Sequence, residues 1–137
     1  MLTTIIRPTK GTAKILGFDV QQKSLEVKKR IGFMPDVPGF YGEMKASELL
    51  NFYADFYRIP KIDREKKVED LLKMMQLDEF KNKKVKTFSR GMKQKLGFAS
   101  SLINDPEVLI LDEPTIGLDP STTHFLKNPL NPLTKKV

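Results

Sequence analysis

The chain has 137 residues, of which 39% are hydrophobic and 30% are charged, and its formal net charge is +7. This length and composition are typical of one globular domain or part of one, and they exclude an intrinsically disordered protein. The chain has no cysteine, no apolar run near the roughly 20 residues of a membrane span, and no secretory segment in residues 1–10, so we expect a soluble, cytosolic chain without disulfides or thiolate metal sites.

The first predicted elements are two short strands with a helix between them. Residues 11–18, GTAKILGF, are predicted as a strand bracketed by glycines, and residues 31–35, IGFMP, as a strand that ends at proline. The intervening residues 23–30, KSLEVKKR, are compatible with a short helix.

From Gly42 onward the hydrophobic residues follow a helical period. One set is Leu49, Phe52, Tyr53, Phe56 and Tyr57, and the next is Val68, Leu71, Leu72 and Met75. Residues 42–80 are therefore predicted as a helical layer inserted between strands. The four aromatic residues of the first set are compatible with a cofactor site, but such stripes more often pack in a core, and we expect core packing here.

Much of the positive charge lies between residues 61 and 95, which hold 12 Lys or Arg against 6 Asp or Glu. Such a segment can contact nucleic acid or an anionic membrane surface. However, the densest lysine cluster, residues 81–86, contains no aromatic residue, although Phe80 and Phe88 flank it. Because a base-stacking groove needs aromatic side chains, we interpret the segment as a solvated helical face and expect no nucleic-acid partner.

A third helix is predicted to begin at Ser89 and to end before Pro106. Ser89 is a good N-cap, and one face of the segment is apolar: Met92, Leu96, Ala99 and Ile103. The start of this helix combines a hydroxyl, a glycine and free backbone N–H groups at the positive end of the helix dipole, which is the composition of an anion site. The alternative is that Ser89 serves only as a cap.

The apolar run of residues 108–111, bounded by Pro106 and Pro114, is predicted as a fully buried strand. Asp112 and Glu113 follow at its carboxyl end, where ligands bind in open α/β sheets. One of these carboxylates can hold Mg²⁺ through water while the other orients an attacking water, as phosphoryl transfer requires. A polar turn is the alternative, because Asp and Pro are common in turns.

In this order and spacing, these motifs resemble the nucleotide-binding subunit of an ABC transporter. FSRGMKQ resembles the signature loop, LILDE the Walker B strand, GLDP the D-loop, IGFMPDVPGFYGEM the Q-loop segment, and TTIIRPTKGTAKILGFDV the stretch after the phosphate-binding helix. The resemblance implies an α/β fold, a partial P-loop NTPase core with an inserted helical subdomain. Its expected parts are residues 1–41 (core), 42–105 (helical subdomain ending in the signature helix), 106–123 (Walker B strand and D-loop) and 124–137 (atypical tail).

The resemblance also implies ATP and Mg²⁺ as cofactors and assigns roles to residues. Asp112 would hold Mg²⁺ through water and Glu113 would be the catalytic base. The signature residues would bind ATP held by a partner subunit; they are Ser89, Arg90, Gly91 and Met92. The D-loop residues would align the two subunits; they are Gly117, Leu118 and Asp119. Asp36 occupies the Q-loop position, where the family usually has glutamine, and its shorter, charged side chain reaches less far.

A phosphate-binding loop requires G-x-x-x-x-G-K-[ST], and none of the eight glycines is followed by lysine. His124 is too close to the D-loop to be the family's switch histidine. We therefore expect an internal piece of an ABC ATPase that lacks the Walker A strand and loop and that alone neither binds nor hydrolyses ATP appreciably. Loss of that strand is expected to expose an apolar edge and face near residues 108–111, which predicts poor solubility or pairing with another chain.

Three functions are compatible with the resemblance. The first is the ATPase of a membrane exporter, which acts with a transmembrane permease subunit and a second ATP-binding subunit, head to tail, on the cytoplasmic face of the membrane. Arg90 and Met92 favour the exporter, because this signature sequence is similar to that of ABC-2 type exporters. The second is a soluble ABC ATPase that acts on ribosomes or DNA. The third is a non-catalytic fragment that offers Ser89 and Gly91 to an intact partner.

Overall fold

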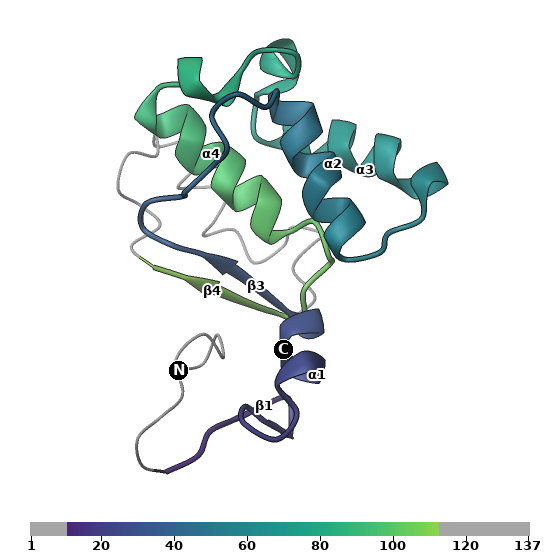
Figure 1. Cartoon of the computed structure of the whole chain (residues 1–137), viewed down its shortest axis with the longest axis vertical. Helices are drawn as coiled ribbons and strands as arrows, with labels where there is room; N and C mark the ends of the chain where they lie inside the picture. The colour runs from purple at the N-terminus through teal and green to yellow at the C-terminus, as the bar shows by residue number, and fades with distance from the viewer. Residues whose placement is uncertain (1–10, 113–137) are drawn as a thin grey trace.

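The computed structural model describes residues 11–112. Their elements are β1 (Lys14–Ile15), β2 (Phe18–Asp19), α1 (Ser24–Arg30), β3 (Ile31–Met34), α2 (Ala46–Phe56), α3 (Lys61–Met74), the 3₁₀ turns η1 (Asp78–Phe80) and η2 (Val85–Thr87), α4 (Arg90–Ser101) and β4 (Val108–Leu111). Helices α2, α3 and α4 lie together, β3 and β4 run side by side below α4, and α1 and the first two strands lie at the far end (Figure 1). The mixed α/β composition and the inserted helical layer agree with the sequence prediction.

The prediction of one strand at residues 11–18 is wrong, because the chain reverses within it. β1 and β2 form an antiparallel hairpin in which Ile15 pairs with Phe18. The two residues between them, Leu16 and Gly17, have φ angles of 51° and 79°. Two successive positive φ angles are what a tight type I′ turn needs to match the twist of the strands. Leu-Gly is not one of the dipeptides that announce this turn, so the sequence pattern did not reveal it.

Strands β3 and β4 are parallel and in register, with Ile31 opposite Val108 and Met34 opposite Leu111. Because side chains alternate along a strand, one face of this pair contributes to a small core with α1 and the hairpin, and the other to the helical core. The expectation that β4 is fully buried is wrong: all four of its residues are half-buried. Within the described residues β4 has a strand neighbour on one side only, which leaves its other edge open.

The helical layer encloses the main core of the described residues. Its buried side chains come from all three helices and from the turn after α4, and they include Leu49, Leu50, Ala54, Leu71, Leu72, Leu96, Ala99 and Ile103. The prediction that the aromatic stripe packs in this core is wrong for Phe52 and Phe56, which are 47% and 74% exposed. Tyr53 and Tyr57 are half-buried at the border of the core. The small and aliphatic residues of α2 fill the core instead, which turns the phenylalanines toward the surface.

No helix within residues 11–112 is long and apolar enough to cross a membrane.

Candidate functional site

The start of α4 has the geometry that the sequence predicts. Ser89 has an extended backbone (φ −63°, ψ 165°), and its Oγ accepts a hydrogen bond of 3.2 Å from the amide of Met92. Ser89 and Arg90 are exposed, while Gly91 and Met92 are half-buried. The first N–H groups of a helix have no acceptor within the helix, so this end presents amide donors and the Ser89 hydroxyl hydrogen to solvent. The predicted cap is confirmed, and the end is chemically suited to an anion.

Two carboxylates lie at the carboxyl end of the β3–β4 pair. Asp112 directly follows β4 and is exposed, and its amide donates to the carbonyl of Met34 at the end of β3 over 3.0 Å. Asp36 lies two residues beyond the end of β3. Because parallel strands in register end together, both acids lie outside the carboxyl ends of the strands, where the sequence predicts the site.

A buried glutamine joins the signature helix to the loop that carries Asp36. Gln94 is only 2% exposed, and its Nε2 donates to the backbone carbonyl of Asp36. Two oxygens close to this hydrogen bond, Asp36 Oδ1 and Gln94 Oε1, are buried without a hydrogen-bond partner in the described part of the chain. Sequence reasoning missed Gln94, because a polar residue beside the apolar face of a helix is normally exposed.

The residues at the strand ends fit Mg²⁺ with a nucleotide. Mg²⁺ prefers oxygen ligands and, in phosphate sites, takes one or two carboxylates together with waters and phosphate oxygens. Asp112 is exposed and can accept from a hydrated cation, whereas Asp36 Oδ1 is buried without a donor within residues 11–112. In the same residues there is no cluster of three or more His, Cys, Asp or Glu that would hold a metal alone. This donor set is suited to a cation that arrives with phosphate.

Several predicted site residues lie outside the described residues. These are the proposed catalytic base Glu113, the D-loop residues Gly117, Leu118 and Asp119, and the excluded histidine His124. Their assignments stay predictions.

The segment that precedes the signature is tied to the start of α2. Val85 and Lys86 donate backbone hydrogen bonds of 2.9 Å to the carbonyls of Met44 and Gly42. On the surface, Glu43 accepts from Lys86 at 2.7 Å and from Lys84 at 2.9 Å. These two ammonium groups lower the pKa of Glu43 from 4.5 to about 2. Part of the lysine cluster therefore neutralises an acid on an exposed surface, which agrees with a solvated face.

An aromatic hollow of about 490 Å³ lies between β3, its following loop, α2 and α4. Its lining includes Phe33, Pro38, Phe40, Tyr53, Phe56 and Tyr57. Burial raises the pKa of the Tyr53 and Tyr57 phenols, so both remain neutral at physiological pH. Exposed Val37 (72%) and Tyr41 (67%) lie on the same loop that follows β3. We call this hollow and these two side chains the aromatic surface.

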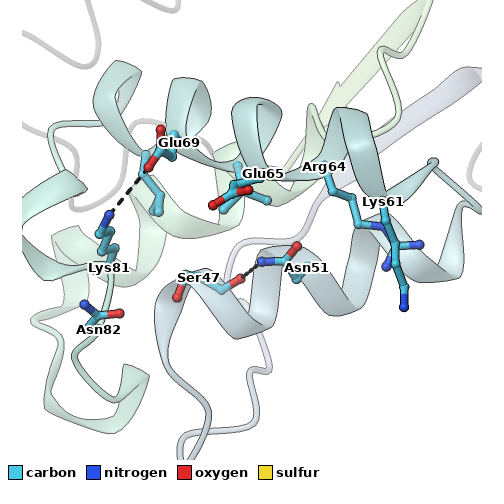
Figure 2. A pocket seen from close by; sticks show the side chains of 10 residues that line it. Ser47, Asn51, Lys61, Arg64, Glu65, Glu69, Lys81 and Asn82 are labelled. Atoms are coloured by element: carbon cyan, nitrogen blue, oxygen red, sulfur yellow. Dashed lines mark hydrogen bonds and ion pairs between the residues drawn. The ribbon is translucent and has the colours of Figure 1, made fainter.

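A second hollow, of about 450 Å³, lies between α2 and α3 and is polar (Figure 2). Lys61, Arg64 and Glu65 extend from α3, while Ser47 and Asn51 face them from α2 (Figure 2). The Lys81–Glu69 ion pair, with 3.5 Å between its charged atoms, lies at one end. None of the site residues predicted from the sequence lines this hollow, so it is separate from the carboxylates at the strand ends and from the start of α4.

Comparison with known proteins identifies the type of protein. Residues 1–116 match the sequence pattern of the family described as ABC transporter. The ABC transporter ATP-binding protein NatA of Bacillus subtilis is 32% identical over 137 residues, which cover 99% of this chain and 56% of NatA. The bacitracin transport ATP-binding protein BcrA of Bacillus licheniformis is 38% identical over 136 residues, which cover 99% of this chain and 44% of BcrA.

Solved structures share the fold. An ATP-binding subunit of an ABC transporter superposes with a TM-score of 0.83 at 26% identity, covering 96% of this chain and 55% of that subunit. The ATP-binding cassette MJ0796, solved as a dimer in a post-hydrolysis state with ADP and Pi, superposes with a TM-score of 0.77 at 26% identity, covering 89% of this chain and 56% of its own. The chain thus spans about half the length of these relatives, and they confirm a partial ABC ATPase fold.

Proposed function

This chain belongs to the ABC transporter family, and we propose that it forms part of an ATP-binding subunit that couples ATP hydrolysis to export across a membrane. The observation that carries the proposal is the placement of Asp36 and Asp112 at the ends of two adjacent parallel strands, with the signature helix hydrogen-bonded to the Asp36 loop. The residues Arg90 and Met92 in the signature favour the exporter branch over a soluble ATPase.

In this proposal each residue has one task. Asp112 would hold Mg²⁺ through water, and the bound cation would neutralise charge on the transferred phosphate. Glu113 would take a proton from the attacking water. The oxygen of this water would bond to the terminal phosphorus as the bond between that phosphorus and the leaving phosphate oxygen breaks. Ser89 and Gly91 would bind the terminal phosphate with the hydroxyl and amide donors of the α4 start.

The nucleotide that Ser89 contacts would be held by a second ATP-binding subunit. The start of α4 is exposed, so a partner can reach it. The chain contains no phosphate-binding loop of its own, so we expect this 137-residue chain alone to bind and hydrolyse ATP no more than marginally. The D-loop residues Gly117, Leu118 and Asp119 would align the pair head to tail.

The permease subunit would dock on the aromatic surface. Phe56, Val37 and Tyr41 are each more than 60% exposed. Phe56 lines the hollow, and the other two lie on the loop whose residues 38–40 line it. Large apolar side chains gathered at a hollow are typical of a protein interaction site. Because the hollow shares the loop of Asp36, a bound permease would contact the segment next to the proposed Mg²⁺ site. This docking would place the subunit on the cytoplasmic face of the membrane.

The nucleotide role is tested by capture on an intact relative. Full-length NatA is immobilised, and this chain is added with Mg²⁺ and either a non-hydrolysable ATP analogue or no nucleotide. We expect capture only with nucleotide, and we expect Ser89→Arg to abolish it because the arginine fills the anion position. Ser24→Arg, at the start of α1, is the matched control and should be captured normally. Capture that is equally strong with and without nucleotide, and that Ser89→Arg does not reduce, would contradict the proposed role.

Direct binding is tested by titrating the chain with a fluorescent ATP analogue and Mg²⁺. Weak, non-saturating binding is expected for both the wild type and Asp112→Asn. Saturable binding that is lost in Asp112→Asn would mean that this chain holds a nucleotide by itself, and the assignment of an in-trans role would be wrong.

The membrane role is tested by fractionating cells of the organism that encodes the chain. A tagged chain is expected with the membranes, and Phe56→Asp is expected to release it. Ile62→Asp changes a more exposed apolar residue of α3, 88% exposed and outside the aromatic surface, so it should leave membrane association unchanged. Recovery of the wild type with ribosomes or DNA would favour a soluble ABC ATPase.

A further inference from the structure

We propose that Gln94 is a positioning residue that locks the signature helix α4 to the Asp36 loop, so that the two move as one unit. This inference rests on the proposed function, since it gives the lock a role in transmitting movement between the permease side and the nucleotide. The lock itself is a property of the described fold.

The first observation is the environment of Gln94. Its side chain is 2% exposed, and its amide donates to the backbone carbonyl of Asp36, 58 residues away in the sequence. Its own oxygen is buried without a partner in residues 11–112. An apolar residue of similar size would fill the same space without leaving an unpaired oxygen. The amide is therefore placed for the bond that it makes to the loop.

The second observation is that the same helix face touches the same segment at two further points. A Cβ added to Gly97 would lie 2.8 Å from Pro38 Cγ, and one added to Gly32 of β3 would lie 2.1 Å from the Ser101 carbonyl oxygen. Residues 94, 97 and 101 fall on one face of a helix. Helix α4 thus lies against β3 and its following loop along most of its length, with the glycines allowing close contact and Gln94 supplying the polar link.

The position of this link suggests what it transmits. Gln94 lies five residues after Ser89, which is about 7.5 Å along a helix. On the other side, the loop continues from Asp36 to Pro38 and Phe40, which line the aromatic surface. A displacement of the loop by a docked partner would therefore carry the start of α4 with it, because the hydrogen bond and the two close contacts leave little room for sliding.

The test measures how firmly the loop and the helix start are held together. The chain has no cysteine, so Val37→Cys and Arg90→Cys provide two unique sites for spin labels on exposed positions. Double electron–electron resonance then gives the distribution of distances between the two spin labels in the nucleotide-free chain. We expect one narrow distribution with Gln94 and at least a twofold broader one in Gln94→Met, which keeps the side-chain size and removes the donor. Gln94→Leu also removes the donor and adds no polar atom, and it serves if the methionine variant fails to fold.

Two controls separate positioning from general stability. Gln94→Lys restores a donor toward the Asp36 carbonyl and is expected to narrow the distribution again. Leu102→Ala removes an apolar contact just after α4 without touching the hydrogen bond, so it is expected to lower the urea midpoint and leave the distribution narrow. Unchanged width in both Gln94→Met and Gln94→Leu, or equal broadening in Leu102→Ala, would overturn the inference. Because no nucleotide or partner is present, this outcome is independent of the capture assay that tests the function.

Discussion

Replacing Gly32 with alanine tests whether α4 packs on β3 as described. The added Cβ would lie 2.1 Å from the carbonyl oxygen of Ser101, 2.8 Å from Leu109 Cδ1 and 3.0 Å from Pro106 Cγ. The first of these atoms belongs to the backbone at the end of α4, which cannot rotate away as a side chain would. The helix and the strand must therefore separate, or the strand must shift relative to its neighbour β4.

The size of the effect follows from the cost of overpacking. Inserting a methyl group into a well-packed core typically costs about 1–3 kcal/mol. Because the closest clash is with backbone, we expect Gly32→Ala to lower the free energy of unfolding by about 3 kcal/mol, at the upper end of this range. This corresponds to roughly a hundredfold change in the folding equilibrium. For a domain of this size the melting temperature would fall by roughly 12 °C or more.

The assay is urea unfolding followed by far-ultraviolet circular dichroism, with extrapolation to zero denaturant. Gly39→Ala is the matched control, because a Cβ at Gly39 meets no atom within 4 Å. Its free energy of unfolding should stay within about 0.5 kcal/mol of the wild type. If Gly32→Ala were as stable as Gly39→Ala, the close contact between α4 and β3 would be wrong, and with it the arrangement that brings Gln94 to Asp36.

Three further predictions concern other polar contacts. Ser89→Ala should lower the free energy of unfolding by about 1 kcal/mol in urea denaturation, whereas Ser89→Asp, which also caps, should be close to wild type. Asp36→Asn should raise the melting temperature, because a neutral carboxamide is less costly to bury than a carboxylate whose Oδ1 has no donor in the described residues, by about 1 kcal/mol in stability; a lower melting temperature would contradict this reasoning. The pKa of Glu43 is lowered from 4.5 to about 2 by Lys86 and Lys84, so its stabilisation is complete above pH 4.5 and lost as the pH falls toward 2. The difference in unfolding free energy between wild type and Glu43→Gln should therefore shrink over this pH range, and a difference that is independent of pH would refute the assignment.

The sequence was sufficient for those features that depend on local pattern. The helical period around Leu49 and around Leu71 predicted the inserted layer, and Ser89 predicted the start of α4. The apolar run before Asp112 predicted a strand, which β4 and its register with β3 confirm. In each case, one segment contains both the periodicity and the capping or breaking residue that define the element.

The errors have a common origin in contacts between distant segments. The sequence pattern treats Phe56 and Leu49 alike, as apolar residues at helical spacing, yet one is 74% exposed and the other is fully buried. Which apolar residues fill the core depends on the neighbouring helices. The sequence analysis missed the hairpin at Leu16 and Gly17 because its turn needs a positive φ angle at Leu16, and leucine does not indicate such an angle.

The motifs and their order, set by the sequence alone, determined the family to which this protein belongs and the start of α4 at Ser89. Only the tertiary structure decided that Gln94 is buried and bonded to the Asp36 loop, and that Gly32 and Gly97 allow α4 to lie close against it. The physical reason is that a hydropathy pattern records the preference of one side chain for water. A hydrogen bond between residues 58 positions apart depends on where the fold places both of them.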